Sequence, residues 1–328
     1  MAMERELALE FVRVTEAAAL AAGRWMGRGQ KEAADAAAVD AMRAMLDSVS
    51  ICGTIVIGEG ERDEAPMLYI GEQVGCADAP CVDIAVDPLE GTNLVAKGLP
   101  NSIAVLAVAE SGQLLHAPDM YMHKIAVGPQ AVGCIDIDAP IADNLNAIAR
   151  ATDRHVNDLT VVVLDRPRHA DMIRDIRKAG ARIKLITDGD VAPAVAAAIA
   201  DSGVDMLLGI GGAPEGVLAA AALKCLGGEM QARLWPENDE QIARAQAMGI
   251  SDVNKVLTHD DLVRGNDVIF AATGITDGDL LRGVRYQGAV ARTHSLVMRS
   301  KTGTVRFIEA IHRIDLKPML KDLLARQE

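Results

Sequence analysis

The sequence predicts an α/β fold, in which helices cover β-sheets. Half of its 328 residues are hydrophobic but only 2% are aromatic. The core must therefore be built from Ala, Val, Ile, Leu and Met, which suits helices packed on sheets better than a β-sandwich. A strand–loop–helix pattern also repeats three times in the second half of the chain, with strands at 159–164, 182–186 and 204–208. The length fits one large domain or two fused halves.

Charge and cysteine content exclude several classes of protein. The formal net charge of −13 argues against nucleic acid or an anionic membrane as partner. A phosphorylated substrate is compatible with it, because bound cations can reverse the local field. Cys76 and Cys81 lack the second Cys/His pair that a zinc site needs, so we expect reduced thiols in a cytoplasmic protein. The charged N-terminus is unlike a signal peptide, and the apolar run 191–200 is too short to cross a bilayer.

Two amphipathic helices are predicted to begin the first half, which we take as residues 1–135. Apolar residues recur at helical spacing over 7–21, and the glycines at 27 and 29 end that helix. The second helix covers 31–47 and carries Asp35 on its inward side. Helix statistics alone favour a dipole-stabilising acid at Asp35.

Glu59 follows a predicted buried strand at 54–57. Gly58 and Gly60 let the backbone bend sharply around it, and α/β proteins place ligand chemistry at such strand ends. The alternative is a nucleotide-binding loop, but that motif needs a glycine where Asp63 stands.

A second acidic turn is predicted at 87–92. The apolar run 82–86 is expected to end at Asp87, where Pro88 forces a turn. Asp87, Glu90 and Thr92 then supply oxygen ligands that suit Mg²⁺ or Mn²⁺ rather than zinc. The alternative is an ordinary turn in which Asp87 caps the following segment. Beyond it, we expect a strand at 103–109 and a hairpin with 114–115.

The second half, 136–328, is expected to supply the loops of the three strand–loop–helix units, after a helix at 141–151. Parallel strands would bring these loops to one carboxyl edge. Arg166 and Arg168 lie in the first loop, Asp188 and Asp190 in the second, and Glu215 follows the glycines in the third. Separately, these residues can be solvated arginines, a helix N-cap and a dipole acid. Together they predict a site for an anion, a polyol and a metal.

The last third gives fewer signals. A polar turn with a short helix is expected over 252–263, and a strand over 267–271. Alternating segments at 294–298 and 305–312 are expected to complete a sheet. The charged tail from Pro318 is expected to fray.

Five motifs occur in a characteristic order: Ile57-Gly58-Glu59-Gly60-Glu61, Asp87-Pro88-Leu89-Glu90-Gly91-Thr92, Arg166-Pro167-Arg168-His169, Asp188-Gly189-Asp190 and Gly211-Gly212-Ala213-Pro214-Glu215-Gly216. As a set they resemble the class II fructose-1,6-bisphosphatases, including the cyanobacterial type that also takes sedoheptulose 1,7-bisphosphate. The likeness runs from Glu10 to about His312. The wider inositol-monophosphatase-like phosphatases share the Asp-Pro-x-x-Gly-Thr element, but they usually carry Asp at the position of Glu90.

The resemblance implies a layered α/β sugar-phosphatase fold forming one catalytic unit. It implies hydrolysis of the 1-phosphate of fructose 1,6-bisphosphate, in gluconeogenesis or the Calvin cycle, and a homo-oligomer. It also implies Mn²⁺ or Mg²⁺ held by Asp35, Glu59, Asp87, Glu90 and Glu215. For Asp35, this overrules the dipole interpretation.

On the same resemblance, catalysis rests on Thr92, Asp87 and Glu59, with Thr92 orienting the attacking water. The substrate contacts it implies are Glu90, Gly91, Thr92, Tyr121, Arg166, Pro167, Arg168, Asp188, Gly189, Asp190 and Gly212. Arg166 and Arg168 would grip the distant phosphate. Three alternatives are a polyol monophosphatase, which the two arginines oppose, a dinucleotide-dependent dehydrogenase, which lacks its glycine fingerprint, and a non-catalytic phosphosugar-binding module.

Overall fold

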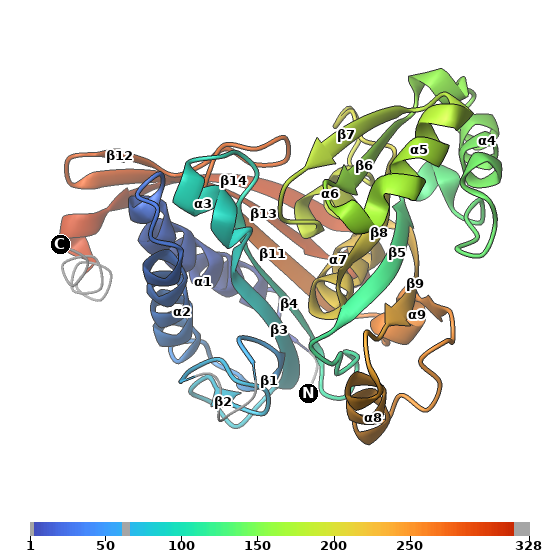
Figure 1. The fold of residues 1–328 in the computed structure, drawn as a ribbon. Helices are drawn as coiled ribbons and strands as arrows, with labels where there is room; N and C mark the ends of the chain where they lie inside the picture. The colour runs from blue at the N-terminus through green and yellow to red at the C-terminus, as the bar shows by residue number, and fades with distance from the viewer. Residues whose placement is uncertain (1–2, 61–65, 318–328) are drawn as a thin grey trace. The chain divides into compact units, whose positions relative to one another are not determined.

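The computed structural model describes residues 3–60 and 66–317. The chain forms two compact units, shown in Figure 1. Unit 1 comprises Met1–Leu114 and Gly265–Glu328, and unit 2 comprises Leu115–Arg264. These bounds differ from the expected halves at 1–135 and 136–328, because strands near the C-terminus complete the sheet that the N-terminal part begins.

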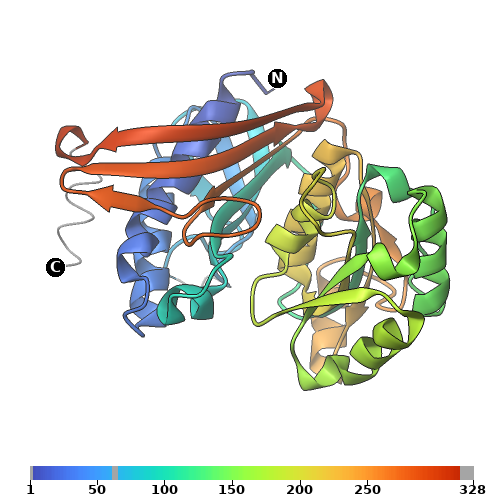
Figure 2. The ribbon, with the colours of Figure 1, turned by 90° about the horizontal axis from the view of Figure 1, so that it is seen from above.

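Unit 1 is an eight-stranded sheet with the order β12-β13-β11-β4-β3-β1-β2, in which β14 pairs with β13. The long pair β13 and β14 is the red hairpin of Figure 2. Helix α1 packs on β13, β11 and β4, and α2 packs on α1 and β3. The bounds are α1 Leu7–Ala22, α2 Lys31–Leu46, β1 Cys52–Ile57, β2 Gln73–Val74, β3 Cys81–Glu90, α3 Thr92–Lys97, β4 Ile103–Glu110, β11 Val268–Gly274, β12 Arg285–Gln287, β13 Val290–Arg299 and β14 Thr304–Arg313.

The core of unit 1 explains why an alanine-rich helix lies against this sheet. Phe11 and Leu20 of α1 are fully buried, as are Ile84 of β3 and Leu106 of β4. The small alanines between the large side chains of α1 let the helix approach the strands closely, as close packing of an interior requires. This buried layer holds β3, and the acidic residues at its end, in a fixed position.

A chain of four hydrogen-bonded groups fastens α1 to β13 and β14. Lys317 Nζ donates to His312 Nδ1 over 2.7 Å, His312 Nε2 lies 2.8 Å from Thr293 Oγ1, and Thr293 Oγ1 donates to Glu16 Oε1 over 3.0 Å. The Lys317 ammonium can only donate, so His312 Nδ1 must accept its hydrogen bond. His312 is therefore neutral, with its proton on Nε2. Burial and the charge of Lys317 lower the pKa of His312 to about 4. They outweigh Glu16 Oε1, 3.6 Å from Nε2, which would favour the charged ring.

Unit 2 is a six-stranded sheet with the order β10-β9-β5-β8-β6-β7. Strand β6 pairs in parallel with both β7 and β8, which confirms the predicted common carboxyl edge. Strand β5 runs antiparallel to β8 and β9. The bounds are β5 Tyr121–Val127, α4 Ile141–Ala151, β6 Thr160–Leu164, α5 Ala170–Ala179, β7 Arg182–Ile186, α6 Val191–Ala196, β8 Met206–Gly212, α7 Ala213–Leu226, β9 Glu229–Trp235, α8 Asp239–Ala247, β10 Leu257–Thr258 and α9 His259–Leu262.

Three local predictions were wrong. The strand expected to end at Asp87 continues to Glu90. The predicted hairpin at 111–115 does not form, because β3 and β11 already pair with the two edges of β4. The glycines at 209–212, expected in a loop, belong to β8. The predictions made on Glu61, on Asp63 and on the tail from Pro318 lie outside the described residues.

Candidate active site

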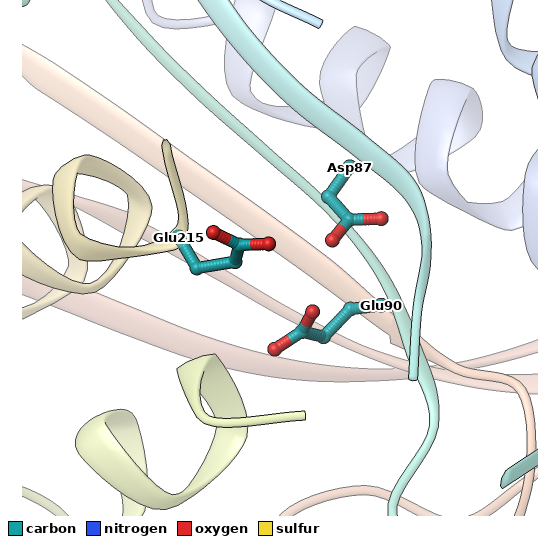
Figure 3. Close-up of side chains that lie close together, drawn as sticks. All are labelled: Asp87, Glu90 and Glu215. Carbon is teal, nitrogen blue, oxygen red and sulfur yellow. The ribbon is translucent and has the colours of Figure 1, made fainter. Parts of the chain in front are cut away.

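A β-bulge in β3 turns Asp87 and Glu90 to the same side of the sheet. Asp87 is paired with Val105 and Glu90 with Ile103. Between these pairs β3 advances by three residues and β4 by two, so β3 contains one extra residue. In a regular strand, residues three apart point to opposite faces, and the extra residue of a bulge cancels that alternation. Figure 3 shows both carboxylates on the same side of β3. Pro88 fits here because a bulge tolerates the missing N–H.

Hydrogen bonds hold this bulge in place. Asp87 Oδ1 accepts from the Leu89 N–H over 3.1 Å, and Ser102 Oγ donates to the Glu90 carbonyl over 2.8 Å. The Glu90 residue is only 4% exposed. The Asp87 bond is the local capping that the turn interpretation predicted, so this residue stabilises the bulge.

Thr92 begins helix α3 directly after the bulge. Gly91 supports it with a left-handed φ of 81°, where an added Cβ would also lie 2.8 Å from Leu94 Cδ1. Glycine adopts this φ without strain. The Thr92 hydroxyl donates to the Leu89 carbonyl over 3.3 Å, and its oxygen lone pairs can still accept from a ligand.

Glu59 and Asp35 bring two further carboxylates into unit 1. The Glu59 N–H donates to the Leu68 carbonyl over 3.0 Å. Gly58 is required there, since a Cβ on it would lie 1.9 Å from the Leu68 oxygen. Burial raises the pKa of Glu59 to about 7, and the negative charge of Asp35 acts in the same direction. Burial also raises the pKa of Asp35. A cation bound beside both groups would relieve this unfavourable charge.

In unit 2, a buried lysine fixes the second loop of the sheet edge. Lys124 is 1% exposed, and its Nζ lies 2.6 Å from Asp190 Oδ2. The same Nζ donates to the Gly212 carbonyl over 2.9 Å. Asp190 is therefore an ion-pair partner, and its side chain makes no N-cap bond to α6. Our sequence reasoning missed Lys124. The available signal was a lysine at an inward-facing position of β5, between Met122 and Ala126.

Glu215 lies in the first turn of α7, next to this ion pair. An added Cβ on Gly211 would lie 2.0 Å from Asp190 Oδ2, and one on Gly212 would lie 1.8 Å from Glu215 Oε2. The glycines thus make room for the two carboxylates. Burial raises the pKa of Glu215, and Lys124 opposes that shift. Glu215 Oε2 is buried without a hydrogen-bond partner among the described residues, as expected of an atom that binds a cation.

The predicted phosphate-gripping arginines differ in their surroundings. Arg168 donates from Nε and Nη2 to the Ile210 carbonyl, over 3.2 and 2.7 Å, and its guanidinium lies 4.3 Å from the Tyr121 ring centre. Arg166 is partly exposed, and its Nη2 lies 3.9 Å from Asp188 Oδ1. Arg168 is therefore held in a fixed orientation by two hydrogen bonds, whereas Arg166 has a carboxylate as its neighbour.

His169, next to these arginines, links β6 to β8. Its Nδ1 lies 2.7 Å from the Leu164 carbonyl, and Nε2 accepts from the Ile210 N–H over 2.8 Å. This pattern requires a neutral ring with its proton on Nδ1. Burial is the main reason that its pKa is lowered. His169 thus positions the loop that carries Arg166 and Arg168 and does not itself face a ligand.

The structure places the predicted residues in two groups. Unit 1 holds Asp35, Glu59, Asp87, Glu90, Gly91 and Thr92. Unit 2 holds Tyr121, Arg166, Pro167, Arg168, Asp188, Gly189, Asp190, Gly212 and Glu215. The carboxylate oxygens of the predicted ligand set suit Mg²⁺ or Mn²⁺.

The fold and these groups are those of an α/β phosphatase. Residues 5–312 match the family model described as "Bacterial fructose-1,6-bisphosphatase, glpX-encoded", and the chain belongs to this family. It is 52% identical to the "D-fructose 1,6-bisphosphatase class 2/sedoheptulose 1,7-bisphosphatase" of Synechococcus sp. (strain JA-3-3Ab), over 95% of this chain and 97% of the relative. It is also 52% identical to the "Fructose-1,6-bisphosphatase 1 class 2" of Escherichia coli (strain K12), over 96% and 97%.

Among the described residues, none of the helices combines the length and the apolar character needed to cross a membrane.

Proposed function

We propose that the two units together form one catalytic unit, a metal-dependent phosphatase. Its reaction is hydrolysis of the 1-phosphate of fructose 1,6-bisphosphate to fructose 6-phosphate and phosphate, with sedoheptulose 1,7-bisphosphate as a second substrate. The observation that carries the proposal is the bulge of β3, which turns Asp87 and Glu90 to one side just before Thr92. It occurs in a chain 52% identical to relatives named for these two substrates.

The proposed cofactor is Mn²⁺ or Mg²⁺, held by Asp35, Glu59, Asp87, Glu90 and Glu215. In support, the bulge of β3 places the carboxylates of Asp87 and Glu90 on the same side of the strand (Figure 3), and carboxylate oxygens suit these ions. The buried Oε2 of Glu215 and the raised pKa of Glu59 both favour a bound cation. When bound, the metal supplies charge neutralisation at the reacting phosphate and a more acidic water.

The chain's own residues have separate roles in this proposal. Thr92 accepts a hydrogen bond from the attacking water and aims it at the phosphorus. Asp87 keeps its place through the Leu89 N–H, so its second oxygen is already oriented before substrate arrives. The Glu90 carboxylate and the Gly91 backbone lie beside the same phosphate.

Substrate binding is assigned to the carboxyl edge of the unit 2 sheet. Arg166 and Arg168 bind the 6-phosphate, because guanidinium forks match phosphate oxygens. The anchoring of Arg168 on Ile210 lowers the side-chain entropy that binding would cost. The proposed contacts to the sugar hydroxyls are Tyr121, Asp188, Gly189, Asp190 and Gly212. Binding energy from the remote phosphate then positions the reacting one.

A phosphate-release assay tests the proposed function. The substrates are fructose 1,6-bisphosphate, sedoheptulose 1,7-bisphosphate, fructose 6-phosphate and inositol 1-phosphate, each with Mn²⁺, with Mg²⁺ or with chelator. We expect release of one phosphate per bisphosphate, only with metal. Faster release from inositol 1-phosphate would identify a polyol monophosphatase. Binding of the bisphosphates without any release would identify a phosphosugar-binding module.

We also propose that the protein is a cytoplasmic homo-oligomer, a dimer or a tetramer. Val305, Phe307 and Ile311 of β14 support an interface, since they alternate along the strand and are 37%, 49% and 61% exposed. Apolar side chains gathered on one face of a strand are typical of contact surfaces. Light scattering on the wild type and on Phe307→Ser tests this: a wild-type monomer would exclude the proposal.

A further inference from the structure

Two cysteines lie side by side at the start of neighbouring strands in unit 1. Cys52 is the first residue of β1 and Cys81 the first of β3, and the two are register partners in the parallel pairing. The Cys52 N–H donates to the Pro80 carbonyl over 2.9 Å, which fixes this register. Paired positions on parallel strands point their side chains to the same face. In keeping with this, the neighbouring Cys81 thiol raises the pKa of Cys52.

The topology selects this pair over the one that the sequence suggests. Cys76 and Cys81 are closer in sequence, but Cys76 follows β2, which pairs with the opposite edge of β1 from β3. The Cys76 thiol instead lies 3.4 Å from the Val49 carbonyl. The remaining cysteines, Cys134 and Cys225, belong to unit 2.

The two thiols have different chemical roles. Cys81 is exposed and Cys52 is half-buried. The Cys81 thiol is the main cause of the raised pKa of Cys52, with burial second. Cys81 is the more accessible of the two thiols, which makes it the first nucleophile.

We propose that Cys52 and Cys81 form a dithiol site that closes to a disulfide by exchange with a small-molecule disulfide such as oxidised glutathione. The Cys81 thiolate attacks one sulfur of the oxidant, and the other half leaves as a thiol after taking up a proton. Cys52 then loses its proton and attacks the Cys81 sulfur, which releases the second thiol. Two electrons pass from the cysteines to the oxidant, which becomes two thiols.

The backbone geometry accommodates this bond. Neighbouring strands are about 4.8 Å apart, and disulfides join Cα atoms separated by about 4.4–6.8 Å. The bond would close the segment from Cys52 to Cys81, which contains β2 and Glu59. It lies at the amino end of β1, whereas Glu59 follows the carboxyl end. The inference therefore stands apart from the proposed function.

Oxidation of the full-length protein with excess oxidised glutathione tests the site. Free thiols are then alkylated, and the masses of the intact protein and of its peptides are measured. We expect three of the five cysteines to be alkylated, and a linked peptide pair containing Cys52 and Cys81. Cys76→Ser is the matched control and should give the same linked pair. Cys52→Ser should instead accumulate a glutathione adduct on Cys81.

Two results of this oxidation experiment would overturn the inference. One is a wild-type protein that carries a stable glutathione adduct on Cys81 while Cys52 is still alkylated. The other is a linked pair of Cys76 and Cys81. Phenylarsine oxide, which bridges adjacent thiols, gives a second readout that needs no variant. Saturation of the wild type by one arsenical, with protection of Cys52 and Cys81 from alkylation, supports the site, and alkylation of both in its presence contradicts it.

Discussion

Lys124→Met is the substitution with the largest consequence that the structure allows us to work out. Methionine keeps most of the volume of the side chain but removes the charge. Asp190 is then left 6% exposed beside Gly211 without its 2.6 Å partner, and the Gly212 carbonyl loses its donor. Breaking a buried ion pair by removing one partner costs about 3–5 kcal/mol.

That free energy converts to a measurable change in melting temperature. In a folding unit of about 150–250 residues, each kcal/mol shifts the midpoint by about 2–4 °C, so we expect unit 2 to melt roughly 6–20 °C lower. Differential scanning calorimetry on the metal-free protein measures it. Lys178→Met on α5, where the lysine is exposed, is the matched control, and its effect should stay within about 0.5 kcal/mol.

The double variant Lys124→Met/Asp190→Asn separates the ion pair from other effects. Because it removes both charges, we expect it to be more stable than Lys124→Met alone, with a coupling of at least about 1 kcal/mol. The reasoning would be refuted if Lys124→Met had the same melting temperature as the Lys178→Met control. It would equally be refuted if the two substitutions simply added.

Three further predictions concern the proposed site and the buried network of unit 1. Thr92→Ala should nearly abolish turnover while Thr92→Ser keeps much of it, and equal activity of the two variants would exclude the assigned role. Gly212→Ala places a Cβ 1.8 Å from Glu215 Oε2, so we expect the metal concentration for half-maximal activity to rise about fivefold or more, from about 1–3 kcal/mol of overpacking. Gly209→Ala on the same strand, whose Cβ would lie 3.5 Å from the His169 ring, should leave that concentration unchanged. His312, with its pKa lowered to about 4 against about 6.5 unfolded, contributes stability that is present above about pH 6.5 and lost as pH falls toward 4. Denaturant titrations across this range should therefore show a smaller loss for His312→Gln, although the raised pKa of the neighbouring Glu16 acts in the opposite direction; equal slopes would contradict the assignment.

The parts of the fold that sequence reasoning predicted are those with local signals. Helix α4 and strand β7 agree with their predicted bounds to the residue, since hydrophobic period and flanking turn residues define them. The common edge of β6, β7 and β8 followed from the strand–loop–helix rhythm. The loops that carry Arg166, Asp188 and Asp190 could therefore be placed together from the order of residues alone.

The remaining features depend on pairing between distant segments. Pro88 and Gly91 mark a turn locally, yet pairing of Asp87 and Glu90 with β4 keeps this stretch in the sheet and makes it a bulge. Lys124 had no local signal beyond its place in an apolar strand, because its partner Asp190 is far along the chain. Asp35 needed the family resemblance, since its electrostatic partner Glu59 follows a different element.

The interruption of unit 1 by unit 2 has a consequence for how the chain reaches its folded state. Strands β4 and β11 pair from Ile103↔Gly274 to Ala109↔Val268, although about 150 residues separate them. Closing so long an unfolded loop costs about 4 kcal/mol of chain entropy. Unit 2 draws its own ends together, as the Leu115 N–H donates to the Leu262 carbonyl over 2.9 Å. We therefore expect unit 2 to fold first. By bringing its ends together, it would shorten the loop between β4 and β11 and speed the formation of this central strand pair of unit 1.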